Sequence, residues 1–507
     1  MMKNLLRFSA GSNQGSFRGM VATSCAVVLL SACASFKGIE TSGTLRQPAD
    51  YSTAESLPDQ HGQWPDTKWA QAIGGASLQS LIDEAIAGNP NLQIAAARVA
   101  AVTAMTDAAD AASRPSVSAS FDSTYQRFSE NYIIPPPYAG TYRTDNALRL
   151  NFSYDFDFWG KHAGELRSAL SQGKAAQAEQ YNARLVIATS VARTWIQLAR
   201  QYAQLDLNQQ QLDVTAKIAH LTQLRLDAGL DAKSENQQTR QQVASLGAEH
   251  EQLLEQISLT RNQLAALLGQ GPDRGRQIER PVLPADVAIA LPDTLPLELL
   301  GRRPDIVAAR WQVEAVQGDI SAAKAAFYPN INLMAYAGFS SIGLNNLLKS
   351  GSRIVGVGPA ITMPILEGRT LRANLKGRVA EYDSMVATYN RALTDALHDV
   401  ADQVTSLRAV ALQSEQQKKA TQAASGNLDL AQQRERIGTT NMLPALAAEM
   451  TLLSQRRVDL DLQARRSDLR IGLIKALGGG FDAQAQGLAI EQNSTPSNVS
   501  TSVRSAS

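Results

Sequence analysis

The segment Leu148-Arg149-Leu150-Asn151-Phe152-Ser153-Tyr154-Asp155-Phe156-Asp157-Phe158 alternates large apolar residues with polar ones along its whole length. A period of two is typical of a β-strand that presents one face to an apolar environment and the other to water. Three other segments have apolar residues on one face with the same period: 117–125, 331–339 and 355–365. The sequence therefore predicts four strands, which loops at 129–143 and 340–352 join into two hairpins.

Prolines and glycines recur at matching distances in the two halves of the chain. Pro90 and Pro115 are 25 residues apart, and so are Pro304 and Pro329. The glycines that follow are separated by 69 and 40 residues in the first half, and by 70 and 40 in the second: Gly160, Gly229 and Gly269, then Gly368, Gly438 and Gly478. Landmarks that stay in register over such distances indicate an internal two-fold repeat. We assign its copies to residues 78–280 and 281–480.

Helices are expected on either side of each hairpin. Residues 91–113 and 305–328 are rich in alanine and almost free of glycine and proline, so each predicts a helix before a hairpin. After each hairpin come about 65 residues almost without breakers, and a helix of that length would be roughly 100 Å long. Small and apolar residues at spacings of three and four along 198–219 favour coiled-coil packing. We expect these helices to turn back at Gly229 and Gly438. Arg225 and Arg434 lie four residues before these glycines, where a cation favours the C-terminal end of a helix.

The remaining segments are interpreted as connectors. Residues 33–77 are polar and irregular and are expected to be extended. Residues 270–301 hold five prolines and are interpreted as an extended strap between the two copies. The tail at 481–507 is rich in serine, glutamine and threonine, so it is expected to be disordered.

The first 32 residues are typical of an export signal. Three cations precede an apolar stretch at 20–30, which is too short to span a membrane: Lys3, Arg7 and Arg18. Leu30-Ser31-Ala32-Cys33 then looks like a bacterial lipobox, which predicts a covalent lipid on Cys33 and no other cofactor. A plain signal peptide with an incidental cysteine is the alternative. Lipidation is favoured because the other cysteine, Cys25, lies inside the signal, and Ala34 favours the outer membrane.

The signal is followed by no run of 18 apolar residues, so a membrane-spanning helix is not expected. Amphipathic strands can cross a bilayer only as a closed barrel. Four strands are too few, because the smallest such barrels have about eight. The chain is therefore expected to oligomerise, with the Leu/Phe/Tyr face of 148–158 toward lipid and the Arg/Asn/Asp face toward a lumen. An ordinary soluble hairpin packed on a core remains an alternative on pattern alone.

Composition and motifs argue against other classes of function. The net charge of +1 gives no reason to expect a nucleic-acid partner. The five histidines lack metal-ligand spacing, and after His250-Glu251 the second position of a zinc-protease motif is Leu254. Gly356-Val357-Gly358 lies in a strand pattern and not before a helix, which argues against a nucleotide site. We therefore predict no catalytic residues, no metal site and no enzymatic activity.

Several segments resemble the NodT-type outer membrane lipoproteins of the TolC-like outer membrane factor family. They are 225–229, 434–438, 475–480 and the segment Leu291-Pro292-Asp293-Thr294-Leu295-Pro296-Leu297-Glu298-Leu299-Leu300-Gly301-Arg302-Arg303-Pro304-Asp305-Ile306. The resemblance covers roughly residues 30–480. It implies an α+β membrane protein, a homotrimer whose four strands per chain form a 12-stranded β-barrel above a periplasmic tunnel of coiled-coil helices.

The same resemblance implies a function and partners. Such channels are the outer membrane component of tripartite efflux systems of the resistance-nodulation-division class. They dock a periplasmic adaptor and an inner-membrane pump, and they passively conduct drugs or other toxic compounds outward. A duct for type I protein secretion is an alternative with the same architecture. A lipid-anchored coiled coil that bridges the envelope layers without a pore is a third interpretation, against which the alternating strand faces argue.

The resemblance also implies a closing aperture at the helix tips just after Gly229 and Gly438. The candidate residues are acidic in both copies, with one apolar constriction residue: Asp231, Glu235, Leu443 and Glu449. This chain departs from the family pattern at Ala447, where many relatives have an aspartate, and at Met450, where some have an arginine. Carboxylates crowded at a pore would raise each other's pKa and attract cations. The alternative is that these acids are ordinary solvated charges at the tips.

Overall fold

The structure is a computed structural model that describes residues 36, 38–52, 55–56, 62–284 and 295–490. The chain divides into two compact units. We call the first the sheet unit; it comprises the described residues within Met1–Thr44, Ala101–Gly173 and Trp311–Ala387. The second, the helical unit, comprises those within Leu45–Ala100, Lys174–Arg310 and Thr388–Ser507. The predicted signal peptide and Cys33 lie outside the described residues.

The main elements follow one order twice along the chain: a helix, two strands, a long helix and a second helix. The first series is α3 (Pro90–Ala112), β1 (Ser116–Arg127), β2 (Tyr142–Phe156), α4 (Lys161–Asp227) and α5 (Lys233–Leu267). The second is α8 (Pro304–Ala325), β3 (Asn330–Ile342), β4 (Arg353–Thr362), α9 (Gly368–Arg436) and α10 (Leu443–Ala476). All ten helices and strands expected from the sequence are present, with ends shifted by a few residues. None of the helices among the described residues has the length and apolarity that a membrane crossing requires.

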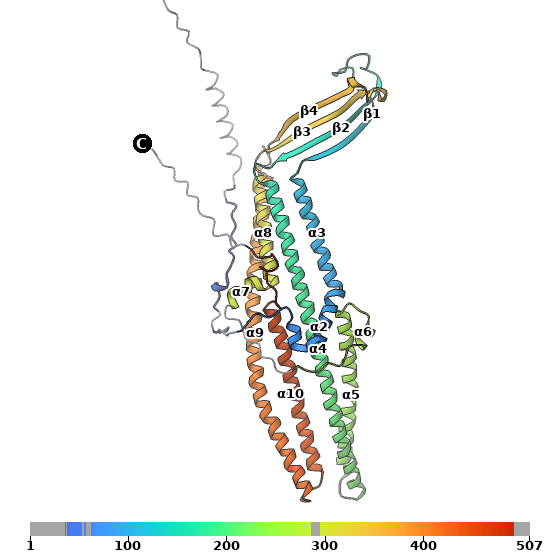
Figure 1. Cartoon of the computed structure of the whole chain (residues 1–507), viewed down its shortest axis with the longest axis vertical. Coiled ribbons are helices and arrows are strands. Elements are labelled where there is room, and N and C mark those ends of the chain that lie inside the picture. The colour runs from blue at the N-terminus through green and yellow to red at the C-terminus, as the bar shows by residue number, and fades with distance from the viewer. Residues whose placement is uncertain (1–35, 37, 53–54, 57–61, 285–294, 491–507) are drawn as a thin grey trace, which may run out of the picture. The chain divides into compact units, whose positions relative to one another are not determined.

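The sheet unit contains an antiparallel sheet in the order β1-β2-β3-β4 (Figure 1). The two predicted hairpins are its outer pairs, and β2 pairs with β3 between them. The loop between β3 and β4 contains two 3-10 turns, η2 (Leu344–Asn346) and η3 (Ser350–Ser352).

Two glycines allow α4 and α8 to meet closely within the sheet unit. A Cβ added at Gly164 would lie 2.9 Å from the carbonyl oxygen of Gly318, and one added at Gly318 would lie 2.7 Å from the Ser168 backbone nitrogen. Such contacts exclude any larger residue unless the helices separate. Gly318 interrupts the alanine-rich pattern of 305–328. The close crossing of α4 and α8 explains why a glycine stands at this position.

An N-terminal clip joins the start of the described chain to α9 in the sheet unit. Asp383 accepts hydrogen bonds from the backbone nitrogens of Ser42 (3.0 Å) and Gly43 (2.8 Å), and from the Ser42 hydroxyl (2.7 Å). The Ser42 hydroxyl bond and the Gly43 amide bond hold the pKa of Asp383 below its usual range. Nearby, Ile39 is buried in a cluster that includes Leu375, and the ring of Phe36 meets a second ring of that cluster, Phe327, edge-on at 5.1 Å.

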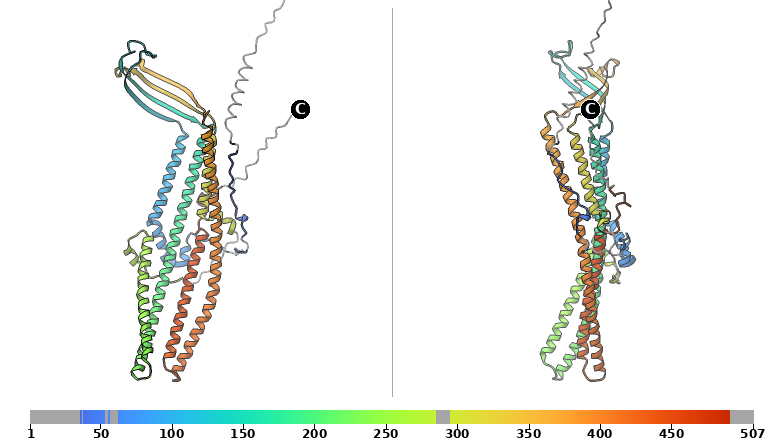
Figure 2. Two further views of the ribbon diagram at one scale, coloured as in Figure 1. Left: turned by 180° about the vertical axis from the view of Figure 1, so that it is seen from behind. Right: turned by 90° about the vertical axis from the view of Figure 1, so that its left-hand side faces the viewer.

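In the helical unit, α4 with α5 and α9 with α10 form two long hairpins (Figure 2). The largest hydrophobic cluster joins them to α2 (Trp69–Gly88), with Trp69, Trp195 and Ile471 among its buried members. Buried residues at seven-residue intervals along α4 are polar: Thr194, Gln201, Asn208, Thr215 and Thr222. The helices therefore pack through a partly polar coiled-coil seam. This seam is displaced from the stripe predicted along 198–219, in which Gln209 and Ala216 are exposed.

In the helical unit, a glycine that follows a long helix packs closely against the last carbonyl of a shorter helix, and this contact occurs twice. A Cβ added at Gly269, after α5, would lie 2.2 Å from the carbonyl oxygen of Gly88 at the end of α2. One added at Gly478, after α10, would lie 1.9 Å from the carbonyl oxygen of Arg302. Arg302 ends the short helix α7 (Leu295–Arg302).

The residue after Gly88 and the residue after Arg302 each donate a hydrogen bond back to the end of the long helix. The Asn89 side chain donates to the Leu267 carbonyl (2.7 Å), and Arg303 donates to the Ala476 carbonyl (3.4 Å). Arg303 is only 8% exposed and also pairs with Asp305 and Asp399. This structural role of Arg303 was not predicted from the sequence.

The structure corrects three of the predicted connectors. The segment 33–77, expected to be extended, contains the start of α2 at Trp69; the helix kinks at Gly74 and Gly75, which obscured its periodicity. The strap at 270–301 is extended only in part, because it includes α6 (Pro272–Arg276) and the start of α7. The tail expected to be disordered from 481 onward is packed at its start, where the buried residues are Phe481, Ala483 and Leu488.

Candidate functional site

The four-stranded sheet has one apolar and one polar face. The register places Phe121 opposite Leu148, and Leu148 opposite Phe339. It also places Ala337 opposite Val355. The other face carries small and polar residues, including Ser120, Arg149, Asn151, Asn332 and Gly358. The two-faced alternation predicted for 148–158 is therefore confirmed and extends over all four strands.

The apolar face is largely uncovered within the chain. Val355 is 83% exposed, Val357 77% and Phe121 56%. Burial of such surface is worth about 25 cal/mol per Å², so a continuous exposed apolar face indicates contact with lipid or another chain. The strands β1 and β4 lie at the two edges of the sheet. Edge strands carry backbone donors and acceptors that can pair with a further strand.

Aromatic side chains cluster at both ends of the sheet. At one end, the rings of Tyr125 and Tyr142 stack at 5.8 Å, on the strands that lead into the β1–β2 loop. At the other end, Trp159 stacks on Tyr328 at 4.6 Å, and its indole nitrogen donates to the Pro329 carbonyl at 2.9 Å. Aromatic residues favour the two interfaces of a bilayer because one end of the ring is apolar and the other polar.

The turn between α4 and α5 holds two of the predicted aperture residues. Gly229 has a φ of +72°, and the Leu230 amide donates to the Arg225 carbonyl at 2.8 Å, which completes a glycine cap. Asp231 accepts two hydrogen bonds from the Arg225 guanidinium, at 2.7 and 2.8 Å. The Glu235 carboxylate accepts from the Ala232 amide at 2.8 Å, at the start of α5. Both acids thus stabilise the turn itself.

The Arg225 pair gives the turn a pH dependence. Its hydrogen bonds lower the pKa of Asp231. The pair therefore contributes stability above the ordinary aspartate pKa of about 3.9, and this contribution is lost as the pH falls through the lowered value. We expect the hydrogen-exchange protection factor of the Leu230 amide to fall as the pH is lowered from about 5 through the lowered pKa of Asp231. In Asp231→Asn this acid-dependent fall should be absent; the same fall in the variant would contradict the assignment.

The turn between α9 and α10 is built from different residues. Gly438 has a φ of +75°, and the Thr439 amide and hydroxyl donate to the Arg434 carbonyl at 3.0 and 2.9 Å. The Asn441 side chain accepts from the amide of Leu443, the first residue of α10, at 3.1 Å. This turn is capped by neutral side chains, whereas the α4–α5 turn is capped by an ion pair and a glutamate.

The other predicted residues of the second tip lie along α10. Leu443 and Glu449 are half-buried, and Ala447 is exposed. Met450 packs against the cluster around Val214, and its sulfur accepts from the Thr215 hydroxyl at 3.6 Å. The structure thus places Asp231 and Glu235 at the α4–α5 turn and Leu443 at the α9–α10 turn, whereas Glu449 lies further along α10. The pKa of Asp231 is lowered within one chain, and the expected rise at a shared aperture, which requires several chains, stays a prediction.

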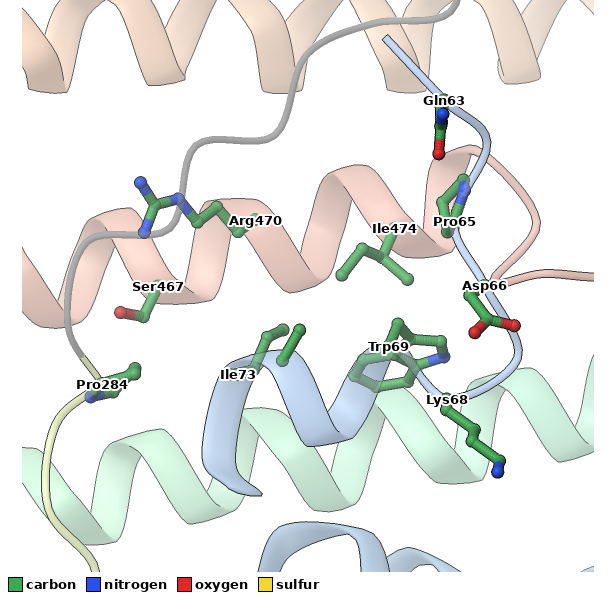
Figure 3. A pocket seen from close by; sticks show the side chains of 11 residues that line it. Gln63, Pro65, Asp66, Lys68, Trp69, Ile73, Pro284, Ser467, Arg470 and Ile474 are labelled. Carbon is green, nitrogen blue, oxygen red and sulfur yellow. The ribbon is translucent and has the colours of Figure 1, made fainter. Parts of the chain in front are cut away.

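A cavity of about 250 Å³ lies in the helical unit between α2 and α10 (Figure 3). Trp69 and Ile73 from α2 and Ile474 from α10 give it an apolar lining, and the Arg470 and Lys68 side chains stand at its rim. The cavity could not be predicted from the sequence, because its lining combines a helix that was not expected, α2, with α10, which lies about 400 residues later. No described group of three or more His, Cys, Asp or Glu side chains could hold a metal ion.

Comparisons with known proteins agree with this architecture. A family model described as outer membrane efflux protein matches residues 81–270 and 295–479. The multidrug resistance outer membrane protein MdtP of Escherichia coli (strain K12) is 31% identical over 464 residues, covering 90% of this chain and 95% of that protein. The fusaric acid resistance protein FusA of Burkholderia cepacia is 35% identical over 329 residues, covering 64% of this chain and 62% of that protein.

A solved structure is similar over most of the chain. The outer membrane protein VceC from Vibrio cholerae matches with a TM-score of 0.76 and 37% sequence identity. The match covers 83% of this chain and 100% of VceC. The similarity thus includes both the strands and the long helices.

Proposed function

Because the chain belongs to the outer membrane efflux protein family and is a channel component of the outer membrane, we propose that three copies form its pore. Each copy contributes the strands β1 to β4, and the three sheets join edge to edge into one barrel of 12 strands. The apolar face is directed to lipid and the polar face lines the lumen. The helices form a periplasmic tunnel, and cargo passes without chemical conversion.

The sheet is the observation that carries this proposal. Its apolar face is exposed along four strands, and β1 and β4 leave an edge on each side. An open edge is not tolerated in the hydrocarbon layer of a membrane, because its backbone groups would lack partners there. Pairing β4 of one copy with β1 of the next gives hydrogen-bond partners to the backbone groups of both edge strands. The matching order of elements in the two halves of the chain supports an origin by internal duplication.

Conductance measurements on the full-length protein test the pore. We expect the protein purified in detergent to have the mass of a trimer and to produce uniform conductance steps in planar lipid bilayers. A variant with Arg at Val357, in the middle of the apolar face, should assemble poorly, since a cation at the bilayer midplane costs about 2–4 kcal/mol per chain. The matched variant with Arg at Gly358, on the polar face, should still conduct. A monomer without conductance would contradict the proposal.

We further propose that Cys33 carries the lipid anchor. The N-terminal clip supports this, because it fixes Ser42 to Asp383 only nine residues after Cys33. The mass of the purified chain should show acyl groups on Cys33 and loss of residues 1–32. Replacement of Cys33 by alanine should remove them.

The partners and cargo are part of the same proposal. We infer that the α4–α5 and α9–α10 turns face a periplasmic adaptor, and that an inner-membrane pump of the resistance-nodulation-division class drives the flow. Asp231, Glu235, Leu443 and Glu449 would lie near the closed aperture. Drugs or other toxic compounds are the proposed cargo, since MdtP and FusA are named for resistance to multiple drugs and to fusaric acid. Co-expression with the candidate pump and adaptor should raise drug resistance only when this channel is present.

A further inference from the structure

Two exposed apolar side chains stand on the polar face of the sheet, where Ile342 and Ile354 are half-buried. Met334 and Tyr336 of β3 are 52% and 44% exposed. The register places Met334 opposite Gly358 and Tyr336 opposite Gly356 on β4. The Tyr336 ring lies directly over Gly356, where an added Cβ would be 2.6 Å from its Cζ atom. A Cβ added at Gly358 would have nothing within 4 Å, so space is open beside Met334.

A cation lies next to this pair on the same face. Arg149 of β2 is exposed and is paired with Gly338, two residues along β3 from Tyr336. Diagonal neighbours in a sheet are about 7–8 Å apart, which is within the reach of an arginine side chain. The nearest acid by register is Asp122, diagonal to Arg149 on the β1 side. No ion pair joins Arg149 to any residue in the described part of the chain.

The polar side chains around these residues bond to one another. The Asn151 amide donates to the Ser120 hydroxyl at 3.2 Å, and the Asn332 amide donates to the Ser153 hydroxyl at 3.0 Å. These polar groups therefore have partners within the sheet. The Arg149 guanidinium, the Tyr336 ring and the Met334 thioether are therefore exposed next to one another to a molecule that approaches this part of the face.

The three groups together fit one class of small molecule. An aromatic ring stacks on tyrosine and contacts a methionine sulfur favourably. An arginine guanidinium matches the planar geometry of a carboxylate. We propose that Arg149, Met334 and Tyr336 form a weak binding site for aromatic carboxylates that pass through the pore. This inference rests on the proposed function, because only in the barrel does the polar face line a lumen.

Salicylate and its uncharged analogue salicyl alcohol test the proposal in planar bilayers containing the full-length protein. We expect salicylate to reduce the single-channel conductance at lower concentrations than the alcohol does. Replacement Tyr336→Ser should raise the apparent Kd for salicylate about twofold to tenfold, since a ring pair contributes about 0.5–1.5 kcal/mol. Replacement Arg149→Gln should remove the preference for salicylate over the alcohol.

Two further variants separate this site from general effects on the pore. Arg143→Gln removes the same charge from the same face of β2, six residues from Arg149, and should leave the preference unchanged. Tyr336→Phe should retain the affinity for salicylate. Equal effects of salicylate and the alcohol on the unmodified channel, or an unchanged Kd in Tyr336→Ser, would overturn the inference while conductance persists. Absence of any conductance would instead count against the proposed pore.

Discussion

Replacing Gly478 by alanine is expected to destabilise the protein by about 2–5 kcal/mol and to reduce its amount in the outer membrane. Gly478 has a φ of +85°, a conformation that costs an L-residue about 1–2 kcal/mol. The added Cβ would also lie 1.9 Å from the carbonyl oxygen of Arg302, so the backbone must shift. A shift of that kind costs about 1–3 kcal/mol more. It would also disturb the contacts of the neighbouring Arg303 with Asp305, Asp399 and the Ala476 carbonyl. The Tm of the purified protein measures the effect.

Gly438→Ala is the matched control. Gly438 also follows a long helix and has a φ of +75°, but an added Cβ would have nothing within 4 Å. Its substitution should therefore cost only the conformational part, about 1–2 kcal/mol. Equal losses of Tm in the two variants would show that the close contact with Arg302 has no energetic weight.

The second large effect is expected at Arg303. Its side chain is 10% exposed and makes a bidentate pair with Asp305 (2.6 Å) and a further pair with Asp399 (3.1 Å). Replacement by alanine would leave two carboxylates and the Ala476 carbonyl without this donor. Breaking a buried pair typically costs about 3–5 kcal/mol. Asp305 and Asp399 are 33% and 56% exposed and can recover water, so we expect about 2–4 kcal/mol, measured as a loss of Tm.

Arg302→Ala provides the comparison, because the adjacent arginine has the same chemistry in a more exposed position. It is 31% exposed and pairs with Asp482 at 3.1 Å. A pair of this kind contributes about 0–1 kcal/mol. Arg303→Lys should give an intermediate loss, since lysine keeps the charge but not the planar fork. If Arg302→Ala cost as much as Arg303→Ala, burial would not be the source of the effect.

The strands and the helices of the main series could be predicted from sequence because their signals are local. Alternation along 148–158 fixed both the strand and the sides of its residues, and prolines marked the ends of the helices before each hairpin. These features depend on neighbouring residues alone. The observed register then brings the apolar residues of all four strands to one face, as the alternation predicted.

Features that depend on distant partners could not be predicted. The helix α2 contains Gly74 and Gly75, and a pair of glycines is typical of a loop. The helix is stabilised by the packing of Trp69 against α4 and α10, which the local sequence does not show. The residues from Phe481 to Leu488 are polar on average, yet their few apolar side chains are buried. In each case the deciding contact joins segments far apart in sequence, and no local pattern records it.

The candidate site was predicted in part. Gly229 and Gly438 were expected as turns, and both have positive φ. The ion pair between Arg225 and Asp231 was not predicted. The hydrogen bond from the Ala232 amide to Glu235 was not predicted either, although an acid at the third position of a helix is a known capping signal. The exposed pair Met334 and Tyr336 on the polar face of β3 was not predicted, because only the register shows that these residues lie opposite glycines of β4.

The N-terminal clip has a consequence for the order of assembly. Ser42 lies near the start of the described chain, yet its partner Asp383 comes 341 residues later. Contacts so distant in sequence close late, after the intervening chain has been made. A chain truncated before α9 would keep its leading segment unattached, so docking of that segment reports that most of the polypeptide is present. Formation of the clip therefore requires a chain that extends at least to Asp383.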